Sequence, residues 1–140
     1  MVRSLAAMMA TALLAVPLTT QAAPAPDGAE ARIISPKDGA TVSSPFVVTF
    51  GLSGMGVAPA GVEREHTGHH HLLVDVETLP PSGQAIPSDE HHRHFGGGQT
   101  EVTLDLPPGE HTLQLLLGDH MHAPHTPPVM SDKISVTVSE

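Results

Sequence analysis

Residues 101–117 read EVTLDLPPGEHTLQLLL, and this stretch decides the fold class. Apolar and polar residues alternate in Glu101 to Leu106 and again in His111 to Leu117, which predicts two β-strands. The intervening Pro107-Pro108-Gly109-Glu110 predicts a four-residue hairpin loop with glycine available for a positive φ. The stretch therefore points to β-structure.

The rest of the chain repeats this pattern, with short segments rich in Val, Ile, Leu, Thr and Phe between clusters of Pro, Gly, Ser and Asp. Four more strands are expected at Ala31 to Ile34, Phe46 to Leu52, His70 to Val76 and Ile134 to Val138. No stretch shows sustained 3.6-residue periodicity. We therefore expect an all-β chain, an immunoglobulin-like antiparallel β-sandwich of about seven strands.

Composition narrows the function. The chain has 140 residues, which is the length of one domain, and it contains 11 histidines and no cysteine. Without cysteine there are no disulfides, cysteine-based zinc fingers, iron–sulfur clusters or thiol nucleophiles. Six Lys plus Arg face fifteen Asp plus Glu, a balance that argues against binding nucleic acid or an anionic membrane.

The first 22 residues have the pattern of a secretory signal peptide. Arg3 precedes a twelve-residue apolar run, and Thr20-Gln21-Ala22 supplies small residues at the cleavage positions. The run is too short to span a membrane, so we expect a protein exported to the periplasm. The predicted organisation is a signal peptide at 1–22, a flexible lead-in at 23–30 and one β-sandwich domain at 31–140.

Histidine position is the main functional signal. In an immunoglobulin-like sandwich the loops before the third and fifth strands and after the sixth strand emerge at one end. Ten of the eleven histidines fall there, as do Met55, Met121 and Met130, whereas His111 falls at the other end. The ten are His66, His69, His70, His71, His91, His92, His94, His120, His122 and His125.

Strand alternation selects among these histidines. His70 shares a row with Leu72 and Val74 and is expected in the core, which leaves His69 and His71 pointing together. His120 and His122 repeat the same i, i+2 spacing. Imidazoles from separate segments that converge are what a transition metal needs, and Asp119, Asp89 and Glu90 are candidate acceptors for their second nitrogens. The predicted metal ligands are His69, His71, His94, His120, His122 and His125.

Plainer interpretations apply to the other histidines. His66, His91 and His92 fit solvated loop residues, and His111 fits a structural or surface residue. A chance gathering of loop histidines remains the alternative to a metal site as a whole. The run Gly96-Gly97-Gly98 is not a phosphate-binding loop, because it lacks the Lys-Ser/Thr of that motif and precedes a strand.

Copper is the metal favoured by the residues, with zinc as the alternative. Imidazole suits both ions, the Irving–Williams order favours copper, and thioether sulfur nearby suits cuprous copper. The expected partners are a metal ion and another periplasmic protein, with no nucleic acid and no membrane span.

Three strings resemble an exported bacterial family known as a domain of unknown function. They are GHHHLLVDV at 68–76, HFGGGQTEVTLDLPPGEHTLQLLLGDHMHAPHTPPVMS at 94–131 and KISVTV at 133–138. The resemblance covers Ile33 to Val138 and implies an exported β-sandwich but no activity. A lysine of the family pattern is replaced here by Gly97. The family's recurring histidines fall on His69, His70, His71, His94, His111, His122 and His125.

A looser similarity extends over SPKDGATVSSPFVVTFGLSGM at 35–55, which is similar to bacterial immunoglobulin-like modules and to periplasmic copper carriers of that fold. Those carriers commonly use a terminal histidine that this chain lacks. Three function classes follow from the sequence. The first is a periplasmic copper carrier or buffer, the second is a metal-dependent enzyme such as a superoxide-dismutase-like redox protein, and the third is an adhesion or assembly module with a pH-responsive histidine patch.

Overall fold

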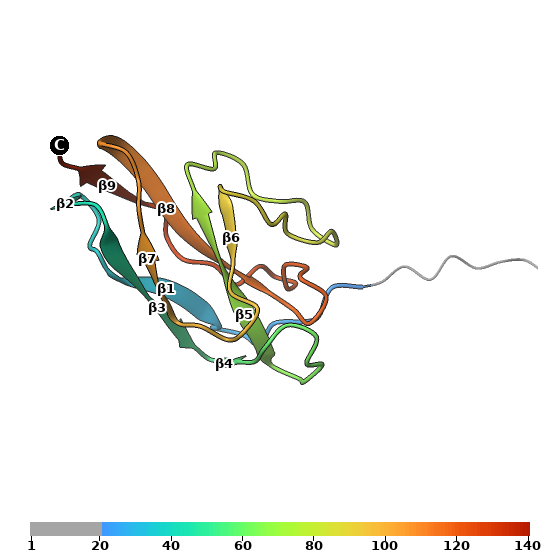
Figure 1. Cartoon of the computed structure of the whole chain (residues 1–140). Helices are drawn as coiled ribbons and strands as arrows, with labels where there is room; N and C mark the ends of the chain where they lie inside the picture. Colours follow the sequence, from blue (N-terminus) through green and yellow to red (C-terminus); the bar gives the residue numbers. More distant parts are fainter. Residues whose placement is uncertain (1–20) are drawn as a thin grey trace, which may run out of the picture.

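The computed structural model describes residues 21–140, which form nine β-strands and no helix in that range. The strands make two sheets, one with the order β1-β3-β7 and one with the order β2-β9-β8-β5-β4, in which β6 also pairs with β5 (Figure 1). The strands are β1 (Glu30–Ser35), β2 (Ala40–Val42), β3 (Phe46–Ser53), β4 (Gly56–Val57), β5 (Thr67–Val74), β6 (His92–His94), β7 (Glu101–Leu104), β8 (Gly109–Gly118) and β9 (Ile134–Val138).

This architecture confirms the all-β sandwich, and each of the six predicted segments overlaps a strand. The three strands that were not predicted, β2, β4 and β6, are only two or three residues long. Two of them, β2 and β4, pair in parallel with β9 and β5, whereas the other pairings are antiparallel. The predicted signal peptide at 1–22 lies almost wholly outside the described residues.

The predicted hairpin at Pro107-Pro108-Gly109-Glu110 is wrong. The strand before it, β7, pairs with β3, whereas β8 lies between β5 and β9 in the other sheet. The loop therefore carries the chain from one sheet to the other. Alternation of apolar residues predicts which face of a strand is buried, but it does not predict which strand it pairs with.

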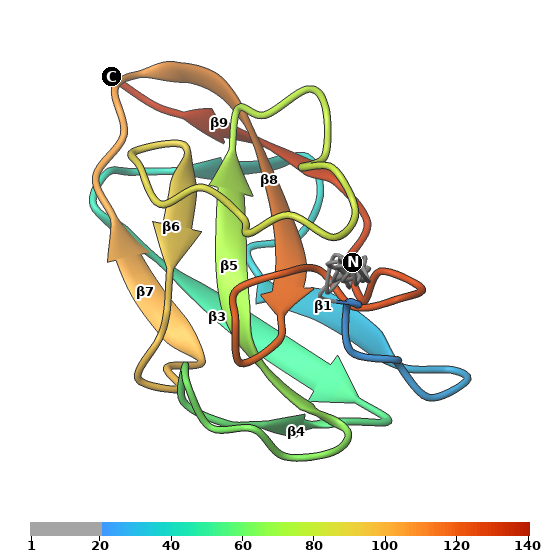
Figure 2. The ribbon, with the colours of Figure 1, turned by 90° about the vertical axis from the view of Figure 1, so that its right-hand side faces the viewer.

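The main core fills the space between the two sheets. One buried cluster there joins residues of three strands, namely Phe50 of β3, Leu72 and Val74 of β5, and Leu113 and Leu115 of β8. Alternate residues of β5 and β8 face the opposite side, where Leu73 and Leu116 form a small cluster with Ile86. The long β5–β6 connection covers this outer face, so β5 is buried on both sides (Figures 1 and 2).

The segment before β1 runs beside the loop that follows β8. The amide of Ala25 donates to the carbonyl of Thr126, and the amide of Thr126 donates to the carbonyl of Ala23, both at 3.0 Å. Among the described residues, no helix has the length and apolar character needed to cross a bilayer.

Candidate metal centre

Strand β5 separates its three consecutive histidines onto two faces, as its alternation predicts. His70 points into the main core, where its ring centroid lies 5.2 Å from that of Phe50. His69 and His71 point to the outer face, with ring centroids 4.8 Å apart. All three side chains are buried. The outer face of β5 is therefore where a histidine site can form.

Two further histidines complete a group on this face. His94 is placed beside His71 by the pairing of β6 with β5, and His122 comes from the loop after β8. Each of the four residues offers one ligand atom, and these atoms all lie within 4.8 Å of one another. We call His69, His71, His94 and His122 the four-histidine centre.

The nitrogen atoms of the centre have the spacing of metal donors. Nε2 of His69 lies 3.1 Å from Nδ1 of His122 and 3.2 Å from Nε2 of His94. Two nitrogens bound tetrahedrally to one ion at about 2.0–2.1 Å are about 3.3 Å apart. Hydrogen bonding explains the contacts less well, because Nε2 of His69 has either one proton or one lone pair and would have to share it between both neighbours.

The electrostatics favour the neutral forms of His69, His71 and His94. Burial, the largest influence, and the neighbouring histidines together lower the pKa of His69 to about 4 and that of His71 to about 3. Burial and the nearby His122 also lower the pKa of His94. A metal binds only the neutral imidazole, so the lone pairs of these rings are available at neutral pH.

Two glycines leave space for the rings of the centre. A Cβ atom at Gly118 would lie 2.6 Å from Cε1 of His71, and one at Gly96 would lie 2.9 Å from Nε2 of His94. Neither distance is tolerated by a real side chain. The glycine run at 96–98 thus has a steric reason to begin with glycine.

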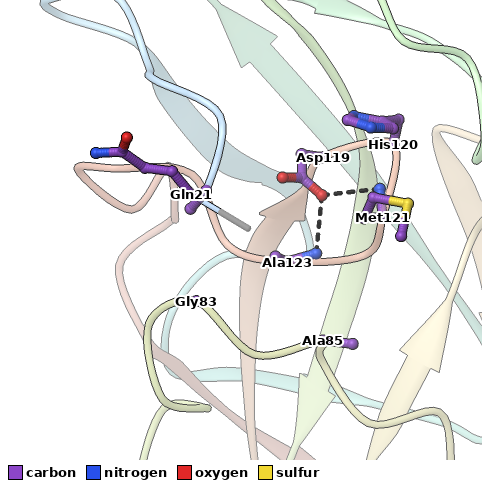
Figure 3. Close-up of a pocket in the computed structure, with 8 residues that line it drawn as sticks. Gln21, Gly83, Ala85, Asp119, His120, Met121 and Ala123 are labelled. Carbon is purple, nitrogen blue, oxygen red and sulfur yellow. Dashed lines mark hydrogen bonds between the residues drawn. The ribbon is translucent and has the colours of Figure 1, made fainter. Parts of the chain in front are cut away.

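A tight turn presents His122. Oδ1 of Asp119 accepts hydrogen bonds from the amides of Met121 and Ala123, at 2.9 and 3.0 Å (Figure 3). His122 itself has a φ of 67°, in the left-handed region that few residues other than glycine adopt. Its carbonyl accepts from the amide of Ile86 at 2.8 Å. Asp119 was expected to accept a hydrogen bond from a histidine ring. It instead accepts hydrogen bonds from the backbone of the turn that positions His122.

His120 and His125 lie outside the four-histidine centre. The alternation assumed for His120 and His122 does not apply, because they belong to a turn and not to a strand. His120 is half-buried and lines a surface pocket with Asp119. His125 is buried, and its Nε2 lies 3.2 Å from the carbonyl oxygen of Thr67.

The expectation that ten histidines share one end of the sandwich is wrong. Because β6 runs antiparallel to β5, His91 and His92 lie toward the far end of β5 from His69. Nδ1 of His91 lies 2.9 Å from the carbonyl oxygen of Val74, and Nδ1 of His92 lies 2.9 Å from Oδ1 of Asp89. Asp89 therefore interacts with His92 and not with a residue of the four-histidine centre.

The methionines do not strengthen the argument for copper. Met55 packs against the main core, and Met121 and Met130 are exposed at the surface. His111 lies away from the other histidines, as expected, and its ring contacts Asp75 and the carbonyl oxygen of Pro107.

A comparison with curated proteins and with solved structures found no match. A comparison with protein families matched residues 48–139 to the family described as Domain of unknown function (DUF4399). The match includes every residue of the four-histidine centre and both glycines that make room for it. It agrees with the resemblance found in the sequence, except that the match begins at 48. The chain belongs to the DUF4399 domain-of-unknown-function family.

Proposed function

We propose that this chain is an exported metal-binding protein that carries or buffers copper at the four-histidine centre. The observation that carries the proposal is the convergence on Nε2 of His69, which lies 3.1 Å from one imidazole nitrogen and 3.2 Å from another. Three sequence segments supply these rings, and the lowered pKa values of His69, His71 and His94 favour the neutral imidazole that a metal binds. Export to the periplasm rests on the signal peptide predicted at residues 1–22.

Copper is preferred over zinc because of the donor set. An all-imidazole site accepts either ion, but at a given nitrogen site the Irving–Williams order places copper above zinc. No cysteine is present to favour a closed thiolate zinc site. Zinc is the alternative ion for the same four residues.

A metal-dependent redox enzyme of the superoxide-dismutase type is the second candidate function. One observation favours it, a cavity of about 150 Å³ lined by His71, His94 and His122. Such a space beside the metal is where a substrate would bind. A pH-responsive adhesion patch is less well supported, since burial is the largest cause that lowers the pKa of His69 to about 4 and that of His71 to about 3, which keeps these two rings neutral near pH 6.5.

Elemental analysis of the purified protein tests the proposal, followed by thermal unfolding with and without added Cu(II) or Zn(II). We expect one metal ion per chain and a higher unfolding temperature with copper than with zinc. His66→Ala, which removes an exposed histidine, is the matched control for His71→Ala and should bind copper normally. Protein that holds no stoichiometric metal and is not stabilised by either ion would refute the proposal.

A further inference from the structure

The cavity beside the four-histidine centre has a defined lining. Its volume is about 150 Å³, and it is lined by three histidines of the centre and by three residues of the β5–β6 connection, namely His71, His94, His122, Ala85, Ile86 and Ser88. This volume is well above that required by a single water molecule. The cavity therefore has room for a ligand of two or three non-hydrogen atoms.

The cavity also lies on the open side of the centre. His69 is fully buried and does not line it, whereas the other three histidines do. An ion among the four rings is thus enclosed by the sheet at His69 and faces the cavity on the loop side. A further ligand would reach the ion from that side.

Charge balance indicates what kind of ligand belongs there. Imidazole binds a metal as a neutral ligand, so a divalent ion bound by these four residues would keep its full charge in a partly buried site. Uncompensated buried charge is costly. The carboxylate of Asp119 acts on His69 from a distance, but its oxygens already accept backbone hydrogen bonds from Ala23, Met121 and Ala123.

We infer that the cavity binds a small monovalent anion, of two or three non-hydrogen atoms, that ligates the metal beside His71, His94 and His122. The inference rests on the proposed function, because it needs the metal in place. Ser88 also lines the cavity, and its side chain carries a hydroxyl group that can donate a hydrogen bond to an anion.

Ala85 marks a route from solvent to the cavity. It lines the cavity and also a surface pocket of about 340 Å³ that includes His120 and Met121. Figure 3 shows Ala85 beside the turn that contains Met121 and Ala123. A larger side chain at position 85 should therefore obstruct the anion without replacing a metal ligand.

Azide is the probe that we would use. Cu(II) would be loaded on the purified full chain, the copper content measured, and azide titrated while the charge-transfer absorption and the EPR spectrum are recorded. We expect saturable azide binding by the wild type and a dissociation constant at least about tenfold higher in Ala85→Leu. Ser82→Leu adds the same side chain to an exposed position of the same loop and should bind azide as the wild type does.

The outcomes separate this inference from the proposed function. Copper-loaded wild-type protein whose spectra do not change with azide would overturn the inference alone. Equal azide affinity in the wild type and in copper-loaded Ala85→Leu would overturn the assignment to this cavity. A chain that binds no copper would overturn the inference and the proposed copper function together.

Discussion

His69 and His122 meet nitrogen to nitrogen, with Nε2 of one 3.1 Å from Nδ1 of the other, although 53 residues separate them in the chain. The contact joins a sheet residue to a turn residue whose backbone is in the left-handed region. Backbone strain of this kind is found where function requires a particular geometry. The relationship is accounted for if one ion uses both nitrogens.

Gly96→Ala should disable the centre while leaving the fold intact. The added Cβ would lie 2.9 Å from Nε2 of His94, so the His94 ring must move. We expect copper affinity to fall by about 10- to 100-fold, the range for changes that disturb a ligand's position. Competition against a chelator of known affinity measures the change.

Gly97→Ala is the matched control for this prediction. The atoms nearest to its added Cβ would belong to the flexible side chain of Gln99, the first of them at 3.1 Å. Copper affinity equal to that of the wild type is expected. If Gly96→Ala and Gly97→Ala behaved alike, His94 would not be a ligand that depends on the space at Gly96.

Asp119→Ala should weaken both the fold and the metal site. The substitution removes the acceptor for the amides of Met121 and Ala123, both of which bond to Oδ1. Unpaired backbone donors of this kind cost about 1–3 kcal/mol, so the free energy of unfolding of the metal-free protein should fall by that amount. Urea denaturation measures this change. Asp132→Ala removes an exposed carboxylate and should have little effect, and equal losses in the two variants would contradict the role given to Asp119.

His70→Leu should stabilise the protein without loss of metal binding. His70 is fully buried in the main core, and neither of its ring nitrogens has a hydrogen-bond partner among residues 21–140. Replacing an unpaired polar ring by an apolar side chain removes a cost of about 1–3 kcal/mol. The urea midpoint should rise while the copper stoichiometry stays the same. Loss of copper binding would place His70 in the metal site.

His111 should give the protein a stability component that is lost at high pH. Its Nδ1 donates to Oδ2 of Asp75 at 2.7 Å, and this hydrogen bond raises the pKa of His111 above the ordinary value of 6.5. Its Nε2 donates to the carbonyl oxygen of Pro107 at 2.8 Å, so the two contacts together require the protonated ring. The contribution is therefore complete below pH 6.5 and disappears as the pH rises through the raised pKa.

Thermal unfolding of metal-free wild type and His111→Gln over a pH series measures this effect. The difference in unfolding temperature should be greatest below pH 6.5 and should shrink as the pH rises. His66→Gln, at an exposed position, should show no such trend. A difference that grows with pH would contradict the assigned charge state of His111.

Much of the fold and part of the centre follow from local patterns. The alternation of β5 places His70 in the core and His69 with His71 on the other face, and the structure confirms this division. The main strands are long enough, and apolar enough on one face, to be predicted without knowledge of their partners.

The remaining features depend on long-range contacts. Strand β6 is missed because His92 and Arg93 carry no apolar pattern, and the strand exists through its pairing with β5. That pairing brings His94 to His71 and removes His92 from the site. Alternation fails at His120 because the backbone there forms a turn around Asp119. Gly96 and Gly118 must lack a side chain because the rings of His94 and His71 lie against them, and these contacts exist only in the folded chain.

The most direct test of the central claim is EPR spectroscopy of Cu(II) titrated into the metal-free wild type and into His71→Ala. We expect one copper per chain bound through several imidazole nitrogens in the wild type, with fewer nitrogens and at least about 100-fold weaker binding in His71→Ala. Identical spectra and affinities in the two proteins, or no copper binding by the wild type, would contradict the assignment of His69, His71, His94 and His122 as a metal centre.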